Sequence, residues 1–273
     1  MATLHKAIVD LDDFTESINM LVYGDSGVGK TVFAGTAPNA LILRAENGAV
    51  SAKRQGSKAK VWPINSWTDF EEAYDWLEAN PDVFDWVIID SITKLQELCI
   101  RWILDRAVAE NEKRDPDIPA IQDHYKWQLL MKRYVVMFND LPINTLWTAL
   151  AMHKEDSEGE DLVLPLITGK GYDISASICA EMMVVAHLEI KEVKVKRNGA
   201  TVREDRRQLV TRFTPPFFAK DRYDCIGENG VMVAPTMPKV IAAIGQPSRN
   251  VTSSATRRTA TKKVAATKRV ATR

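Results

Sequence analysis

Residues 18–31 read INMLVYGDSGVGKT and decide the fold, because an apolar run passes directly into a glycine-rich turn. The run at 18–23 is rich in β-forming residues, residues 24–31 match the pattern G-x4-G-K-[ST], and a helical segment follows. Glycines in such a turn let backbone N–H groups point inward at phosphates, and the following helix adds partial positive charge. The stretch predicts a phosphate-binding strand–loop–helix unit of an α/β fold.

The motif also assigns roles to its own side chains. Lys30 is expected to reach the β- and γ-phosphates, and the Thr31 hydroxyl to ligate Mg²⁺. ATP and Mg²⁺ are therefore the expected ligands. The nucleotide-binding residues of the loop are Gly24, Asp25, Ser26, Gly27, Val28, Gly29, Lys30 and Thr31.

Outside this unit, short apolar runs alternate with helical patterns. Apolar runs recur at 40–43, 86–89, 144–151 and 182–190, and amphipathic patterns lie at 67–79, 91–109 and 121–139. Pro116 and Pro119 prevent the last two patterns from joining into one helix, so 110–120 is expected to be a polar break. Near-continuous apolar strands joined by helices predict a mainly parallel central sheet covered on both faces.

After residue 190 the pattern becomes antiparallel. KEVKVKR and ATVREDRRQLVTRF flank Asn198-Gly199, a pair that suits the positive φ angles of a tight hairpin turn. A last short helix is expected at 238–244. Residues 1–245 are predicted to form one α/β domain with this C-terminal antiparallel hairpin.

The formal charge is zero, with 36 basic and 36 acidic residues, but this balance joins two unlike segments. Residues 246–273 carry eight Lys/Arg and no acid, which leaves 28 bases against 36 acids in the rest of the chain. The segment has no aromatic residue, so it cannot bury a core and is expected to be a disordered basic tail. Its partner would be nucleic acid, through salt-dependent phosphate contacts, or an acidic protein such as a single-strand binding protein.

Two acids stand at expected strand ends. Asp90 closes the apolar run WVIID, where one carboxylate can hold Mg²⁺ together with Thr31. Glu46 follows the run at 40–43 in LILRAENG, where it would act as general base on the attacking water. For Glu46 the spacing favours this role no more than that of a solvated loop residue.

Taken in order, GDSGVGKT, AENG and VIIDSITKL resemble the ATPase core of RecA-type recombinases, over about residues 18–224. Only about 17 residues precede the first expected strand, so a counterpart of the N-terminal domain of those recombinases is not expected. The layout is similar to the core-only single-strand annealing ATPases of phages, the Sak-four type. The resemblance implies a RecA-like P-loop NTPase fold.

The same resemblance implies further site residues. His153, in ALAMHKED, takes the place of the γ-phosphate sensor, which is usually Gln; the alternative is a core histidine. Lys220 and Arg222 match a basic pair that reaches the neighbouring subunit's ATP; the alternative is a solvated pair. The segments 110–120 and 154–172 fall where the family has DNA-binding loops, whose basic residues here are Lys113, Arg114, Lys154 and Lys170.

Together with the motifs, this resemblance implies an ATPase that assembles into a ring or filament on single-stranded DNA and promotes annealing or homologous recombination. The alternatives are a hexameric helicase or translocase, and a nucleotide-switched loader with little turnover. No apolar run approaches a membrane span and the N-terminus has no export pattern, so a cytoplasmic location in a phage's bacterial host is expected. The catalytic residues would be Lys30, Glu46, His153, Lys220 and Arg222.

Overall fold

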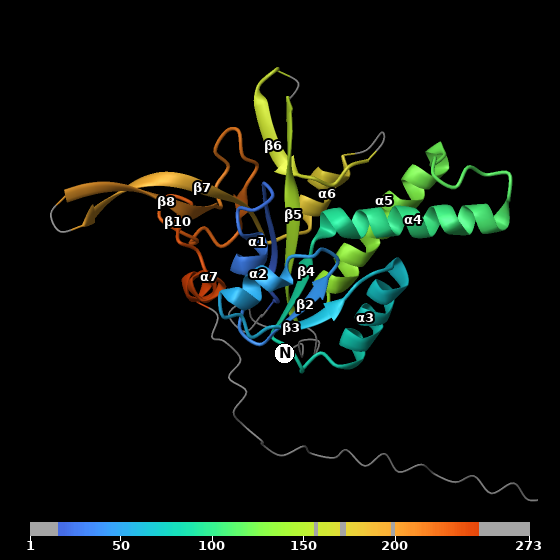
Figure 1. Ribbon diagram of the computed structural model, residues 1–273, viewed down its shortest axis with the longest axis horizontal. Coiled ribbons are helices and arrows are strands. Elements are labelled where there is room, and N and C mark those ends of the chain that lie inside the picture. The colour runs from blue at the N-terminus through green and yellow to red at the C-terminus, as the bar shows by residue number, and fades with distance from the viewer. Residues whose placement is uncertain (1–15, 156–157, 170–172, 198–199, 246–273) are drawn as a thin grey trace, which may run out of the picture.

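The computed structural model describes residues 16–155, 158–169, 173–197 and 200–245, and a mainly parallel sheet runs through its centre (Figure 1). The strands are β1 (Asn19–Gly24), β2 (Ala40–Arg44), β3 (Lys60–Pro63), β4 (Trp86–Asp90), β5 (Asn144–Glu155), β6 (Asp161–Pro165), β7 (Val184–Arg197), β8 (Ala200–Val210), β9 (Lys220–Asp221) and β10 (Val231–Val233). The helices are α1 (Lys30–Ala34), α2 (Ala49–Arg54), α3 (Trp67–Ala79), α4 (Ile92–Glu110), α5 (Ile121–Asn139), α6 (Ile174–Ala180) and α7 (Met237–Ile244).

The order of the strands is β10-β8-β7-β1-β5-β4-β2-β3, with β6 paired to β5 and β9 paired to β7. The strands from β7 to β3 in this order pair in parallel, while β8, β10, β6 and β9 add antiparallel edges. β5 thus separates β1, which leads into the glycine-rich loop, from β4, which ends at Asp90. The predicted α/β class, with a mainly parallel sheet and a C-terminal antiparallel hairpin, is confirmed.

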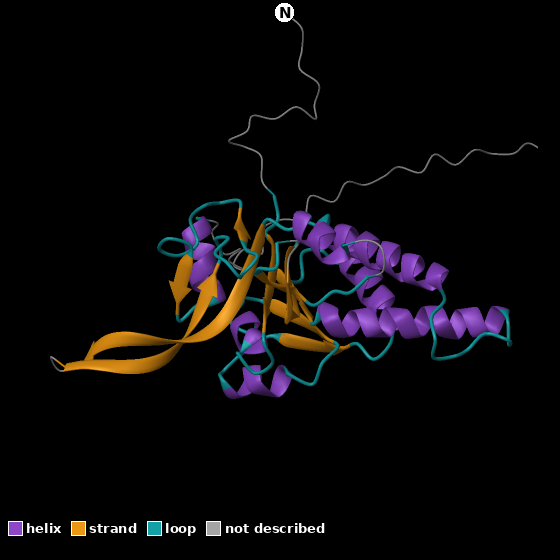
Figure 2. Ribbon diagram, turned by 90° about the horizontal axis from the view of Figure 1, so that it is seen from above, coloured by secondary structure: helices purple, strands orange, loops and turns teal. Residues whose placement is uncertain are grey.

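Each face of the sheet buries its own hydrophobic core. Residues of α3, α4, α5 and α6 pack over one face, where Trp67, Phe70, Phe138 and Trp147 are almost fully buried. α1 and α7 cover the other face with Phe33, Met237 and Val240. Figure 2 shows the long helices gathered on one side, away from the projecting ribbon of β7 and β8. In the described part of the chain, no helix is long and apolar enough to cross a bilayer.

Two of the three predicted amphipathic helices are found with their predicted limits, at Trp67–Ala79 and Ile121–Asn139. The third, predicted at 91–109, is found one residue later, at Ile92–Glu110. A Ser66–Asp69 capping box starts the first of these, which explains its sharp N-terminus. The chain is non-helical between α4 and α5, as the two prolines require. The tail at 246–273 and the turn residues 198–199 lie outside the described residues.

The segment 154–172 was expected to be a loop, and this expectation is wrong for its first part. β5 continues to Glu155 and pairs with β6 in an antiparallel hairpin, with His153 opposite Val163. The physical reason is burial: Val163 and Leu164 are only 3% and 4% exposed, so this short run packs against the body instead of lying in solvent. The hairpin projects from the end of the sheet where β1 meets its loop (Figure 1).

Beneath that hairpin, two aromatic residues join neighbouring strands. The Tyr23 hydroxyl on β1 lies 2.9 Å from the Val163 carbonyl oxygen and 2.7 Å from that of Phe218, and donates to them. His187 on β7 is opposite Tyr23 and stacks on Phe217, with ring centroids 4.0 Å apart. His187 is 5% exposed, so it is a buried imidazole next to the glycine-rich loop.

Burial lowers the pKa of His187 to about 4 from an ordinary 6.5, with Asp25 opposing the shift and His153 and Lys30 adding to it. Between these two pH values the unfolded chain takes up a proton at His187 that the folded chain does not. The free energy of unfolding therefore falls as pH drops through this window and is unaffected by His187 above it.

We expect His187→Phe, which preserves the stack on Phe217, to remove this part of the acid sensitivity. Urea unfolding of variant and wild type, measured above pH 6.5 and again near pH 4, gives the difference in unfolding free energy at each pH. That difference should shift in favour of the variant on acidification. A difference that is independent of pH would show that His187 is not buried in its neutral form.

Candidate nucleotide and magnesium site

The loop between β1 and α1 holds a buried amine. Gly29, with φ at 100°, precedes α1, and Lys30 is the first residue of that helix. The Lys30 side chain is turned back into the loop, where its Nζ donates to the carbonyl oxygens of Gly24 (2.8 Å) and Asp25 (2.9 Å). Burial lowers the pKa of Lys30, while Glu46, Asp90 and Asp25 oppose that shift. These acids help to keep the buried amine charged.

Asp90, at the end of β4, is the most enclosed acid of the site, with 2% exposure. Its Oδ1 accepts a hydrogen bond from the Thr148 hydroxyl on β5 (2.6 Å), and its Oδ2 accepts one from the Thr31 hydroxyl on α1 (2.8 Å). Desolvation raises the pKa of Asp90, the two threonine hydrogen bonds lower it, and Glu46 raises it. The carboxylate is thus held in a fixed orientation toward the glycine-rich loop.

The pair Thr31–Asp90 fits a Mg²⁺ ion, because both groups offer hard oxygen atoms side by side at the mouth of the loop. Gly48, which has no side chain, lies beside these two oxygen atoms. A Cβ added to Gly48 would lie 2.8 Å from the Thr31 Oγ1 and 3.5 Å from the Asp90 Oδ2. A side chain at position 48 would therefore crowd the two oxygen atoms.

Glu46 lies beside this pair. Its backbone N–H and that of Ala45 donate to the carbonyl oxygen of Asp90 (3.1 and 2.8 Å), which joins the carboxyl ends of β2 and β4. The Ser91 hydroxyl donates to the Glu46 Oε1 and also caps α4 by accepting from the Lys94 N–H. The structure therefore brings together all four residues predicted to act in cis on ATP, namely Lys30, Thr31, Glu46 and Asp90.

His153 is placed beside the loop as well. Its Nε2 is 3.3 Å from the Asp25 Oδ1, and both side chains are about two-thirds exposed. The core-histidine alternative is therefore wrong, because the ring projects into solvent from the β5–β6 hairpin. Its role as a γ-phosphate sensor stays a prediction.

Lys220 and Arg222 contact their own chain. The Lys220 Nζ donates to the carbonyl oxygens of Cys179 (2.7 Å) and Ala180 (3.3 Å), and the Arg222 Nη2 donates to that of Ala180 (3.3 Å). They thus bind the C-terminal carbonyls of α6, where cations are favoured. Their reach across a subunit interface stays a prediction.

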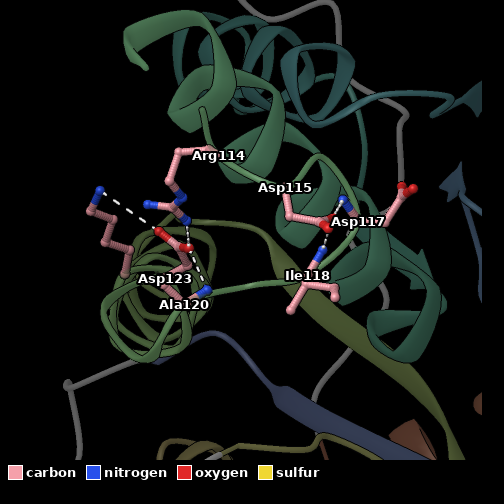
Figure 3. A network of polar contacts seen from close by, with 7 residues as sticks. Arg114, Asp115, Asp117, Ile118, Ala120 and Asp123 are labelled. Carbon is pink, nitrogen blue, oxygen red and sulfur yellow. Dashed lines mark hydrogen bonds and ion pairs between the residues drawn. The ribbon is translucent and has the colours of Figure 1, made fainter. Parts of the chain in front are cut away.

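The break between α4 and α5 is internally bonded (Figure 3). Arg114 forms an ion pair with Asp123, which is 1% exposed and also accepts from the Ala120 N–H at 2.8 Å. Asp115 accepts from two further backbone N–H groups of the loop, at 2.8 and 3.0 Å. The guanidinium of Arg114 therefore anchors the loop to α5, whereas Lys113 is exposed.

Of the two other expected DNA contacts, Lys154 lies near α6. The Lys154 Nζ, on β5, is 3.4 Å from Asp173, the N-cap residue of that helix. Lys170 lies outside the described residues.

Three residues of the site had no assigned role in the sequence. Thr148 and Ser91 orient the two acids, and Arg207 on β8 donates from its Nε to the Val28 carbonyl oxygen of the loop at 2.8 Å. A threonine within the apolar run NTLWTALA is a weak signal of a buried polar contact. Nothing in the local sequence around Arg207 indicates the loop, which lies 179 positions earlier.

Fold and site together define a P-loop nucleotide-binding protein. The family model described as an AAA domain matches residues 16–223, more than half of the chain. The chain belongs to this AAA domain family, and ATP binding and hydrolysis with Mg²⁺ is the general activity that the domain implies. Comparison with curated proteins gives no match.

We expect Thr148→Val to weaken Mg²⁺-dependent nucleotide binding about tenfold, because a hydrogen bond to a charged group contributes about 1.5–3 kcal/mol. The shape of the side chain is kept, so the change removes only the hydroxyl, with its bond to Asp90 and its longer contact of 3.3 Å with the Ile89 carbonyl oxygen. Thr145→Val is the matched control: it is on the same strand and equally buried, but its hydroxyl bonds Asn19 and Asn139. Mg²⁺ titrations of nucleotide affinity check this, and equal losses in both variants would contradict it.

Proposed function

We propose that the chain is a RecA-like, Mg²⁺-dependent ATPase that acts on single-stranded DNA and promotes strand annealing or homologous recombination. The observation that supports ATP hydrolysis best is the convergence of Lys30, Thr31, Glu46 and Asp90 at the start of α1 and the carboxyl ends of the parallel strands β2 and β4. The AAA domain family does not by itself identify the substrate. Action on DNA is therefore the more specific part of the proposal.

Each group has a distinct task in hydrolysis. The Lys30 ammonium neutralises charge on the phosphates, while Thr31 and Asp90 hold the metal. Bound Mg²⁺ supplies charge neutralisation at the phosphate oxygens. In this proposal Glu46 accepts a proton from the attacking water. Because Ser91 binds the Glu46 Oε1, the Oε2 is the oxygen that would take this proton.

The hairpin and the tail support the DNA part. His153 links the β5–β6 hairpin to Asp25 of the loop, so nucleotide state and the position of the hairpin are coupled in this proposal. The eight bases of 246–273 would supply the electrostatic affinity for phosphates. An acidic single-strand binding protein would satisfy the same charges.

Assembly is the third part. The proposal places ATP between protomers of a ring or filament, with Lys220 and Arg222 of one protomer facing the nucleotide of the next. Arg222 holds α6 through one carbonyl at 3.3 Å, a weak contact that exchange with a phosphate would outweigh. Such basic groups contribute to γ-phosphate transfer by stabilising the charge of the transition state.

Lys30→Ala is expected to reduce ATP hydrolysis to background, and single-stranded DNA is expected to stimulate the wild type. Phosphate release by the full chain, with and without DNA, measures both. Lys53→Ala, an exposed lysine on α2, is the control for lost positive charge.

Hydrolysis that survives Lys30→Ala would overturn the site. ATP-dependent unwinding of a forked duplex would favour the translocase. Negligible turnover in wild type under both conditions would favour a nucleotide-switched loader.

A mixture of Lys30→Ala and Arg222→Ala protomers should regain activity that neither has alone. In random assemblies roughly a quarter of the head-to-tail interfaces combine an intact loop with an intact Arg222. ATPase rates of the mixture and of each variant test this, with melting temperatures to show that each variant is folded. A mixture as inactive as its components would contradict a shared interfacial site.

A further inference from the structure

Arg207 contacts the phosphate-binding loop, although the two lie 179 positions apart in the sequence. On β8 it is opposite Ile190 of β7, and its backbone carbonyl accepts from the Ala234 N–H at 2.8 Å, which fixes the strand at this point. Its Nε donates to the Val28 carbonyl oxygen at 2.8 Å. Two positions further, Leu209 is buried in the core shared with α1 and α7, so Arg207 projects from the sheet face that carries the loop helix.

Gly29 gives the guanidinium its space. A Cβ added at Gly29 would lie 2.4 Å from the Arg207 Nε and 2.9 Å from its Cζ. Position 29 favours glycine because of its φ of 100°, and the missing side chain also leaves room for the present position of Arg207. The arginine lies directly against the backbone of the loop.

The consequence follows from the planarity of the peptide. Val28 C=O and Gly29 N–H belong to one trans peptide and point in opposite directions. A donor that holds the carbonyl on the outside of the loop therefore directs the N–H toward its inside, where phosphates are bound. We propose that Arg207 is a positioning residue for phosphate recognition, which aims the Gly29 N–H at the nucleotide without touching it. This rests on nucleotide binding at the loop, as proposed above.

The proposal predicts how the loss of Arg207 affects the binding of ADP and of ATP. Backbone N–H groups of such a loop cradle the α- and β-phosphates. ADP and ATP share these phosphates, so loss of Arg207 should weaken both by the same factor. A guanidinium that moved onto the γ-phosphate would instead affect ATP alone.

The affinity test uses the full chain and isothermal titration with Mg-ADP and Mg-ATP. Arg207→Gln should weaken both nucleotides about tenfold, the loss expected for a charged hydrogen bond, and Arg207→Lys should restore most of it. The matched control is Arg206→Gln, because Arg206 is adjacent on β8 and pairs with Glu204 instead of the loop. Melting temperatures without nucleotide should be unchanged by both glutamine variants.

A second readout observes the amide itself. Val28-Gly29 is the one Val-Gly pair in the sequence, so a chain with ¹³C-carbonyl valine and ¹⁵N-glycine gives a single selected amide signal. On addition of Mg-ADP at saturation, this Gly29 signal should shift downfield in wild type and Arg206→Gln. The shift should be clearly smaller in Arg207→Gln.

The outcomes separate the two proposals. Unchanged affinity in Arg207→Gln, equal loss in Arg206→Gln, a loss confined to ATP, or a full Gly29 shift in Arg207→Gln would each overturn the positioning role. Lys30→Ala is measured in parallel. If Lys30→Ala binds both nucleotides as well as wild type, nucleotide binding at the loop fails; if only Lys30→Ala loses affinity, the role of Arg207 fails alone.

Discussion

The charge of Asp90, withdrawn from water at the end of β4, is the constraint on which the site depends. A buried carboxylate requires hydrogen-bond donors, and two threonines from different elements provide them. This is possible because β5, next to β4, brings Thr148 to one carboxylate oxygen of Asp90, while the helix that follows β1 brings Thr31 to the other. The order of the strands is thus part of the chemistry of the site.

Much of this arrangement could be predicted from short stretches of sequence. Residues 24–31 and the run WVIID combine a local conformation with a defined chemistry, so they indicate both strand ends and their ligands. Contacts between distant segments leave no such local pattern. Arg207 reads as one more base in a charged strand, and only the register of β8 brings it to Val28. The run at 161–165 is likewise too short, and ends in a proline, so it cannot be recognised as a strand without its partner.

The basic residues show why a count of charges is a poor guide to a surface. Arg114, Lys154 and Lys220 were expected from the sequence to contact external phosphates, yet each contacts an acid or a carbonyl of its own chain. Arg207, which had no expected role, also binds a carbonyl of its own chain. Acids and backbone carbonyls of the same chain already bind these cationic side chains. For 246–273 the proposed function therefore rests on composition alone, eight bases and no acid.

Tyr23 has a mechanical consequence. It is the last residue before Gly24, and its hydroxyl oxygen contacts both Val163 of the β5–β6 hairpin and Phe218, two residues before Lys220. Three segments that are far apart in the sequence therefore meet at one atom, the Tyr23 hydroxyl oxygen. A tilt of β1 at the loop would move the hairpin and the segment of Lys220 together, with no flexible chain between them to absorb it.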